Sequence, residues 1–270
     1  MAIHTRPEAG ETPKAYLQWH HDKVRHILKA LQEHNLFLQP EKCSFKQTEI
    51  EFLGIWVKEG TVHMEDHKVD KVKNWEMPRN VWGVQEFLGF TGYYRCFIWD
   101  YSAIAWPLLD LTKKATAWFW GTPQQCAFEE LRDQMCDKPI LRQPDFGKRF
   151  YVQTDASAYG VGAILLQEGE ITPKTPHLFP IVYYSATFTA TERNYDIYEW
   201  ELLVVIKALQ HWQQYLIWTE EPFIIKTDHA NLLYWKSPRK LNRRTARWHA
   251  ELQDYNFQIV HIQYQARVMF

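Results

Sequence analysis

Residues 150–167 read FYVQTDASAYGVGAILLQ, and this stretch decides the fold predicted for the second half of the chain. An apolar run leads into Asp155, and a second apolar run begins after the small residues and glycines that follow. Two such runs with a short connection predict two antiparallel strands. Because a carboxylate is costly to bury, Asp155 at the seam of two core strands requires an explanation from the rest of the chain.

The residues around this stretch predict a mixture of strands and helices. KRFYVQTDA, GVGAILLQ and PIVYYSA follow one another as three apolar runs, which indicates an antiparallel meander. A helix over residues 191–216, a strand PFIIKTD, a helix around residues 246–254 and a final strand FQIVHI complete the order βββαβαβ.

The first half of the chain has a more helical pattern. Residues 1–12 are polar and lack periodicity, so we expect them to form a disordered leader. The elements expected after it are a helix from Pro13 to about Glu33, a hairpin at IEFLGIWVKEGTVHM, short helices over residues 65–114 with Ser102 capping the one that runs to Leu111, and a linking helix within residues 118–144.

Composition narrows the class of protein. The chain of 270 residues is 46% hydrophobic and contains 13 Trp, so it can build a sizeable core. Its net charge of -1 gives no overall attraction to nucleic acid, and any such binding must rest on local patches. The sequence shows no signal peptide, no apolar run of transmembrane length and no zinc-type cysteine spacing, so we expect a soluble intracellular protein with free thiols.

Three carboxylates are predicted to converge in the second half. If the first and fourth strands are neighbours, Asp155 and Asp228 lie at one end of the sheet, and Glu201 in YEWELLVVIKAL lies at the edge of a buried helix face. Such carboxylates repel one another unless cations neutralise them, and oxygen ligands suit Mg²⁺ or Mn²⁺. Two such ions can cleave a phosphodiester. Taken singly, each residue has an ordinary alternative: a turn aspartate or a solvated helix glutamate.

A run of family motifs makes the pattern specific. LFLQPEKCSF, EFLGIWV, FLGFTGYYRCFI, PLLDLTKK, FYVQTDASAYGVGAILLQ, NYDIYEWELLVVIKALQHWQQYL and IIKTDHANL occur in this order. Residues 13–262 resemble the polyprotein of gypsy-class LTR retrotransposons, from the end of the reverse-transcriptase palm through the thumb into the ribonuclease H-like domain.

The resemblance implies a fold, an activity and a set of residues. The fold class is α/β, a ribonuclease H-like mixed five-stranded sheet with flanking helices, preceded by a mostly helical thumb region. The activity is cleavage of the RNA strand of an RNA–DNA hybrid by two metal ions. Asp155, Glu201 and Asp228 match the catalytic, metal-binding carboxylates of the family; Glu199 is the alternative at the helix position, and His229 is expected to make a structural hydrogen bond.

The resemblance also predicts the domain organisation and its limits. Residues 13–63 correspond to residual palm, 64–117 to the thumb and 118–270 to a ribonuclease H-like domain that lacks its last helix and a fourth acidic ligand. The Y-x-D-D motif is absent, so we expect no polymerase activity from this chain, and the missing polymerase and integrase parts are expected partners. The alternative interpretation is a catalytically impaired retroelement remnant that at most binds nucleic acid.

A basic segment, KSPRKLNRRTAR, lies at residues 236–247 and contains no acidic residue. Such a cluster beside a metal site is expected to follow a phosphate backbone, although charge runs are often simply solvated surfaces. The predicted nucleic-acid-binding residues are Lys236, Arg239, Lys240, Arg243, Arg244 and Arg247.

Overall fold

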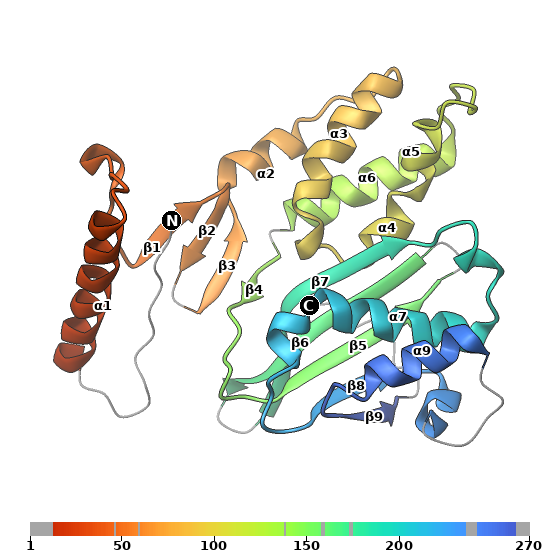
Figure 1. The fold of residues 1–270 in the computed structure, drawn as a ribbon. Coiled ribbons are helices and arrows are strands. Elements are labelled where there is room, and N and C mark those ends of the chain that lie inside the picture. Colours follow the sequence, from red (N-terminus) through yellow and green to blue (C-terminus); the bar gives the residue numbers. More distant parts are fainter. Residues whose placement is uncertain are drawn as a thin grey trace.

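The computed structural model describes residues 13–45, 47–58, 60–137, 139–157, 160–172, 175–235 and 242–262. The expected leader at residues 1–12 lies outside the described residues. Two hydrophobic cores organise the rest, one built from residues 64–141 and the other from residues 150–252. The chain therefore packs as two neighbouring bodies, which Figure 1 shows above and below one another.

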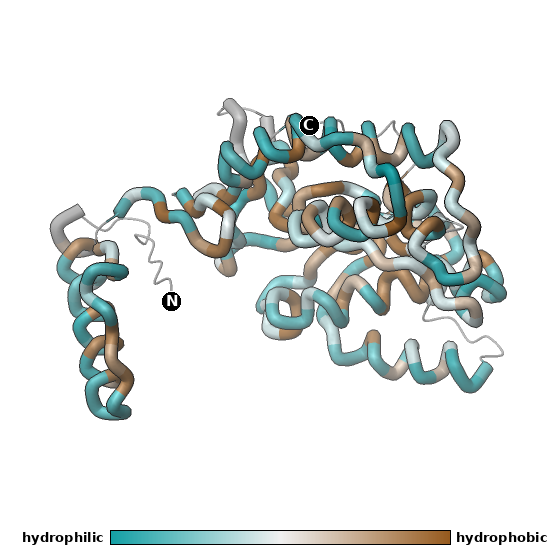
Figure 2. The backbone as a smooth tube through the Cα atoms, turned by 90° about the horizontal axis from the view of Figure 1, so that it is seen from above, coloured by the Kyte–Doolittle hydropathy of each residue, from teal (hydrophilic) through white to brown (hydrophobic). Residues whose placement is uncertain are grey.

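Helix α1 is the first described element, and a small sheet combines three strands that precede the helices of the first core with one strand that follows them. Helix α1 stands apart from the other elements in both views (Figures 1 and 2), with hydrophobic and hydrophilic residues alternating along it. The sheet is antiparallel with strand order β1-β2-β3-β4, and Gly60, at φ +73°, turns β2 into β3. The elements are α1 (Pro13–Glu33), η1 (Pro40–Lys42), β1 (Glu49–Phe52), β2 (Ile55–Lys58), β3 (Thr61–Met64) and β4 (Leu141–Arg142).

Short helices build the first core, as the breaks in the sequence predict. Phe87 and Phe128 are fully buried at its centre with ring centroids 4.7 Å apart. The helix expected to begin with a Ser102 cap is in fact two helices, and Ser102 lies inside the first of them. The helices are α2 (Asp66–Lys73), α3 (Val81–Tyr93), η2 (Arg95–Phe97), α4 (Tyr101–Ile104), α5 (Trp106–Leu111) and α6 (Thr122–Cys136).

The reason for this difference lies on either side of Ser102. Asp100 adopts a left-handed conformation, φ 50° and ψ 34°, and starts α4 two residues earlier than a Ser102 cap would. Pro107 lacks a backbone N–H and is favoured in a first helical turn, so a second helix begins at Trp106. The Ser102 hydroxyl instead hydrogen-bonds the hydroxyl of Ser185 at 3.2 Å.

The second core lies on a mixed five-stranded sheet, which confirms the predicted fold class. Its strand order is β7-β6-β5-β8-β9; β5, β6 and β7 are antiparallel neighbours, whereas β8 runs parallel to both β5 and β9. Helices α7 and α9 lie on one face of this sheet (Figure 1). The elements are β5 (Phe150–Ala156), β6 (Gly160–Thr172), β7 (Thr175–Thr187), η3 (Glu192–Asn194), α7 (Ile197–His211), α8 (Gln213–Leu216), β8 (Phe223–Thr227), η4 (Ala230–Tyr234), α9 (Arg243–Leu252) and β9 (Phe257–His261).

The two faces of this sheet carry different neighbours. Side chains alternate along a strand, so Phe150 and Val152 of β5 point into the core with α7. Residues of the other parity on β6 and β7 face the first body: Tyr183 packs against its core, and Ser185 bonds Ser102 of α4. The parity of β5 assigns Asp155 to this second face.

Candidate active site

Two aspartates lie at the same end of neighbouring parallel strands, as the sequence predicts. The last registered pair between β5 and β8 is Gln153 with Lys226, and Asp155 and Asp228 each follow it by two residues. Adjacent strands are about 4.8 Å apart, so these aspartates lie side by side where the strands end. Asp155 is half-buried and Asp228 is exposed.

Glu201 approaches this end of the sheet from α7, which packs on β5. Its side chain is buried, with the residue 8% exposed, and its Oε2 atom has no hydrogen-bond partner among the residues that the structure describes. Burial, together with the negative charges of Asp228 and Asp155, raises the pKa of Glu201 to about 8. The three carboxylates thus share one electrostatic environment.

The carboxylate of Glu199, the alternative at the helix position, is already bound by other side chains. Arg244 of α9 donates to both of its carboxylate oxygens at 2.6 Å, and Asn242 donates to one of them at 2.6 Å. Burial acts to raise the pKa of Glu199, but these hydrogen bonds outweigh burial and lower the pKa. Because Glu199 is compensated and Glu201 is not, the geometry favours Glu201 as the group that meets a cation.

The loop that carries Asp228 is held by groups on both sides. The backbone N–H of His229 donates to Thr227 Oγ1 at 3.1 Å, and the His229 ring lies 3.4 Å from the amide of Asn231. His261, at the end of β9, places Nε2 3.0 Å from the carbonyl oxygen of Asp228. Sequence reasoning missed His261, although its place at the end of the strand paired with β8 is a signal for it.

The donor set fits a hard divalent cation in its chemistry. All three candidate ligands are carboxylates, and the buried oxygen of Glu201 lacks the partner that a cation would replace. In the part of the chain that the structure describes, no group of three His, Cys, Asp or Glu residues is drawn close enough to hold an ion. Binding of one ion by Asp155, Glu201 and Asp228 would therefore require these three side chains to move closer together.

Two glycines of β6 shape the sheet beside Asp155. A Cβ atom on Gly160 would lie 2.2 Å from the carbonyl oxygen of Ala186, so the approach of β7 requires glycine there. Gly162 is the antiparallel register partner of Asp155. A Cβ on Gly162 would meet only ordinary contacts, which come from Trp99 and Asp100.

The predicted basic segment is partly described. Lys236, Arg239 and Lys240 lie outside the described residues, whereas Arg243, Arg244 and Arg247 lie on α9. Arg243 and Arg247 are exposed and, four residues apart, share one side of the helix. These two side chains are available to a phosphate backbone.

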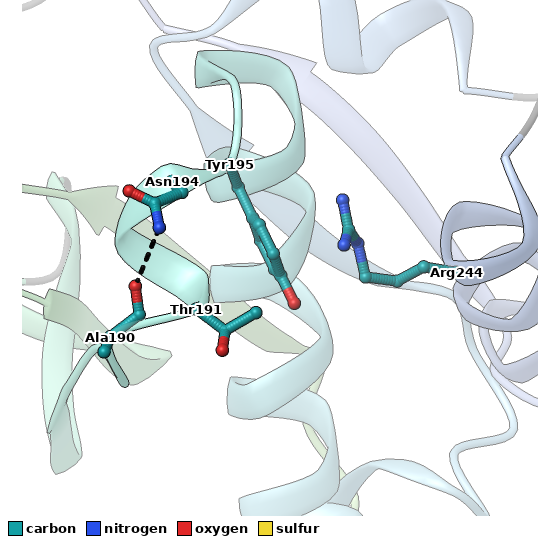
Figure 3. A pocket seen from close by; sticks show the side chains of 5 residues that line it. All are labelled: Ala190, Thr191, Asn194, Tyr195 and Arg244. Carbon is teal, nitrogen blue, oxygen red and sulfur yellow. Dashed lines mark hydrogen bonds between the residues drawn. The ribbon is translucent and has the colours of Figure 1, made fainter.

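Arg244 has a different environment. Besides binding Glu199, its guanidinium lies 3.7 Å from the centre of the Tyr195 ring. Figure 3 shows both side chains at a shallow pocket, whose edge is fixed by a 3.2 Å hydrogen bond from Asn194 to Ala190. The pocket has a volume of about 390 Å³ and is lined by Ala190, Thr191, Asn194, Tyr195 and Arg244.

Comparisons with known proteins agree with this fold. Residues 145–255 match the family described as the RNase H-like domain found in reverse transcriptase. The Tf2-3 and Tf2-4 transposon polyproteins of Schizosaccharomyces pombe are each 37% identical over 242 residues, which is 89% of this chain and 18% of the relative. The chain thus spans less than a fifth of the length of these relatives.

Solved structures of foamy viral protease-reverse transcriptase share the fold. The complex with an RNA/DNA hybrid matches with a TM-score of 0.69 and 22% identity, over 96% of this chain and 35% of that chain. The complex with dsDNA matches with a TM-score of 0.68 and 22% identity, over 92% of this chain and 52% of that chain.

Among the described residues, none of the helices has the length and apolar character needed to cross a membrane.

Proposed function

Residues 145–255 belong to the RNase H-like domain family of reverse transcriptases, in a chain related to gypsy-type retrotransposon polyproteins, and from this premise we propose that the chain cleaves the RNA strand of RNA–DNA hybrids with divalent metal ions. The chain would do so as one part of a longer polyprotein, beside polymerase and integrase parts. The family relation supports the nuclease class, and the carboxylates at the end of β5 and β8 support the mechanism.

A single observation carries the proposal: Glu201 is a buried carboxylate whose Oε2 has no hydrogen-bond partner in the described chain and which lies in the field of two further carboxylates. A structural glutamate in such a position would be expected to have a cationic or hydrogen-bonding partner, as Glu199 has in Arg244. A divalent ion supplies the missing compensation.

The residues of the chain have separate tasks in this mechanism. Asp155, Glu201 and Asp228 would hold Mg²⁺ or Mn²⁺, and such ions would supply an activated water and stabilisation of the leaving oxygen. His261 holds the backbone at Asp228, and α7 holds Glu201 against the sheet. Exposed arginines of α9 would bind phosphates of the duplex and position it.

The test is cleavage of a labelled RNA–DNA hybrid in Mg²⁺ or Mn²⁺, with single-stranded RNA and double-stranded DNA as comparison substrates. We expect cleavage of the hybrid RNA strand alone, and its loss in Asp155→Asn. The matched control is Asp133→Asn, which makes the same chemical change at an exposed position on α6. Equal hybrid cleavage by the wild-type chain and Asp155→Asn would overturn the proposal.

A second candidate function is nucleic-acid binding without cleavage. The observation that favours it is the exposed pair Arg243 and Arg247 on one side of α9, which needs no metal to bind a phosphate backbone. Under this alternative, hybrid binding survives Asp155→Asn and no cleavage is seen in either protein. Metal-dependent cleavage by the wild-type chain decides against it.

A further inference from the structure

A fourth carboxylate, from the first body, lies beside Asp155. A Cβ atom built on Gly162 would be 3.5 Å from Asp100 Oδ1. Gly162 and Asp155 are direct partners in the antiparallel ladder, and such partners project to the same face with Cβ positions about 5 Å apart. The carboxylate of Asp100 therefore lies on the face of the sheet that Asp155 points to, one side chain away from it.

Contacts around Asp100 fix this position. The residues on either side of it are anchored: Trp99 packs edge-on against Tyr183 at 6.2 Å, and both the backbone N–H and the hydroxyl of Ser102 lie 3.2 Å from Ser185 Oγ. Ser185 is the β7 partner of Gly162. Asp155, Gly162 and Ser185 are thus aligned across β5, β6 and β7, and α4 packs on the sheet at this position.

A second observation at this end of the sheet points to a ligand. Glu201 is more than nine-tenths buried, its Oε2 has no partner in the described chain, and it lies in the field of Asp155 and Asp228. Asp155 therefore has Asp100 near it across the Gly162 position, and it acts together with Asp228 on the buried Glu201.

We propose that Asp100 of the thumb region supplies a further oxygen ligand to the divalent-metal site at Asp155. This inference rests on the proposed function, since it concerns the same ions. The proposed site contains residues from both bodies of the chain, because the packing of α4 on β6 and β7 places Asp100 near Asp155. Separating the two bodies would then weaken metal binding without changing a residue of the sheet.

The experiment measures binding of Mn²⁺ by calorimetry and by electron paramagnetic resonance, which need no substrate and no turnover. The variants are Asp100→Asn, Asp155→Asn, the double variant and the control Asp133→Asn. Asparagine suits Asp100 because it tolerates the left-handed conformation found there. We expect Asp100→Asn to weaken Mn²⁺ binding by about tenfold or more. Its effect should be smaller in the Asp155→Asn background, because residues that share an ion are coupled.

The outcomes separate this inference from the proposed function. Wild-type affinity in Asp100→Asn together with weak binding in Asp155→Asn overturns the role of Asp100 and leaves the proposed function intact. Absence of Mn²⁺ binding in the wild-type chain overturns both. Fully additive effects of the two substitutions also contradict a shared ion.

A second variant protects the test from a folding defect in Asp100→Asn. Gly162→Ala keeps every charge and places its methyl group 3.5 Å from Asp100 Oδ1 and 3.6 Å from Trp99, which are ordinary contact distances. The methyl group would contact Asp100 on the face of the sheet that Asp155 points to, so we expect weaker Mn²⁺ binding with an unchanged circular dichroism spectrum. Unchanged affinity in Gly162→Ala, when Asp100→Asn does not fold, overturns the proposal.

Discussion

Glu199 and Glu201 lie two residues apart on α7, both are buried, and their carboxylates have opposite environments. Successive helix residues are rotated by about 100°, so the two side chains point to nearly opposite sides. Glu199 meets Arg244 and Asn242, whereas Glu201 meets Asp155 and Asp228. The pKa is lowered at Glu199 and raised to about 8 at Glu201. The same residue type is thus an ion-pair partner at one position and an uncompensated acid at the other.

We predict that Glu201→Gln changes how the stability of the metal-free protein depends on pH. The wild-type folded state keeps the proton of Glu201 up to its raised pKa of about 8, whereas the unfolded chain loses this proton near the ordinary glutamate pKa of 4.5. Between these values the folded state binds more protons, so the free energy of unfolding falls as pH rises. Glutamine has no proton to lose, so this fall is absent in the variant. At pH 8 the free energy of unfolding of Glu201→Gln should exceed that of the wild type by on the order of a few kcal/mol.

Urea unfolding at several pH values, in the presence of a chelator, measures this effect. Glu86→Gln, at an exposed position of α3, is the matched control and should follow the wild type. Added Mg²⁺ should stabilise the wild-type protein more as pH rises and should not do so for Glu201→Gln. Parallel pH profiles of wild type and Glu201→Gln would contradict the environment described for Glu201.

Glu199→Gln should instead destabilise the fold. The change removes the charge that Arg244 and Asn242 bind, and hydrogen bonds to charged groups contribute about 1.5–3 kcal/mol. Arg244 is partly exposed, which favours the lower end of this range. We expect a lower unfolding temperature by calorimetry and wild-type affinity for Mn²⁺. Loss of Mn²⁺ binding in a folded Glu199→Gln protein would instead make Glu199 the ligand.

The sequence predicts the local features of this structure better than its long-range contacts. Apolar residues alternate around Asp155 and recur with a helical period around Glu201. These local patterns are sufficient to predict the strands and the helix. The choice of Glu201 over Glu199 depends on Arg244, which is more than forty residues away. A helical period places both glutamates on α7 but contains no information about the partner that each one meets.

The features that sequence reasoning missed all depend on packing between distant segments. Asp100 lies on the same face of the sheet as Asp155 because α4 is seated on β6 and β7, and His261 meets the carbonyl oxygen of Asp228 because β9 pairs with β8. Ser102 was expected at a helix cap, and its bond to Ser185 depends on the same seating of α4. Each of these contacts joins segments that are far apart in the sequence, so no local pattern predicts it.

Gly160→Ala should disturb the sheet beside the site. The added Cβ would lie 2.2 Å from the carbonyl oxygen of Ala186, which is backbone and cannot rotate away. Overpacking of this kind costs about 1–3 kcal/mol. We expect a lower unfolding temperature for Gly160→Ala and a near-wild-type value for Gly162→Ala, which provides the comparison within one strand. Equal stability of the two variants would show that β6 and β7 are less tightly paired than described.

Arg243→Gln with Arg247→Gln should weaken hybrid binding without abolishing it. Each arginine that contacts a phosphate contributes about 0.9 to the slope of log affinity against log salt concentration. Losing both should therefore reduce the slope by roughly 1.8. Fluorescence anisotropy at several salt concentrations measures this. The control is Arg149→Gln, which lies beyond the start of β5, at the opposite end of the strand from Asp155. An unchanged slope would assign the two arginines to a solvated surface.

His261→Ala should affect metal binding more than stability. Nε2 of His261 must carry the proton in its contact with Asp228, because the carbonyl oxygen can only accept. One exposed hydrogen bond contributes about 1 kcal/mol or less to folding. Positioning of a metal ligand by a neighbouring group, in contrast, affects metal affinity by about tenfold or more.

The measurement for His261→Ala is Mn²⁺ affinity beside the unfolding temperature, with His67→Ala on α2 as a control far along the chain from the site. His261→Gln offers a partial rescue, because its amide can donate to the same carbonyl oxygen. An affinity order of wild type, His261→Gln and His261→Ala, at nearly constant unfolding temperature, is the pattern expected of a positioning residue. If affinity and unfolding temperature fall together, His261 stabilises the edge of the sheet and not the position of Asp228.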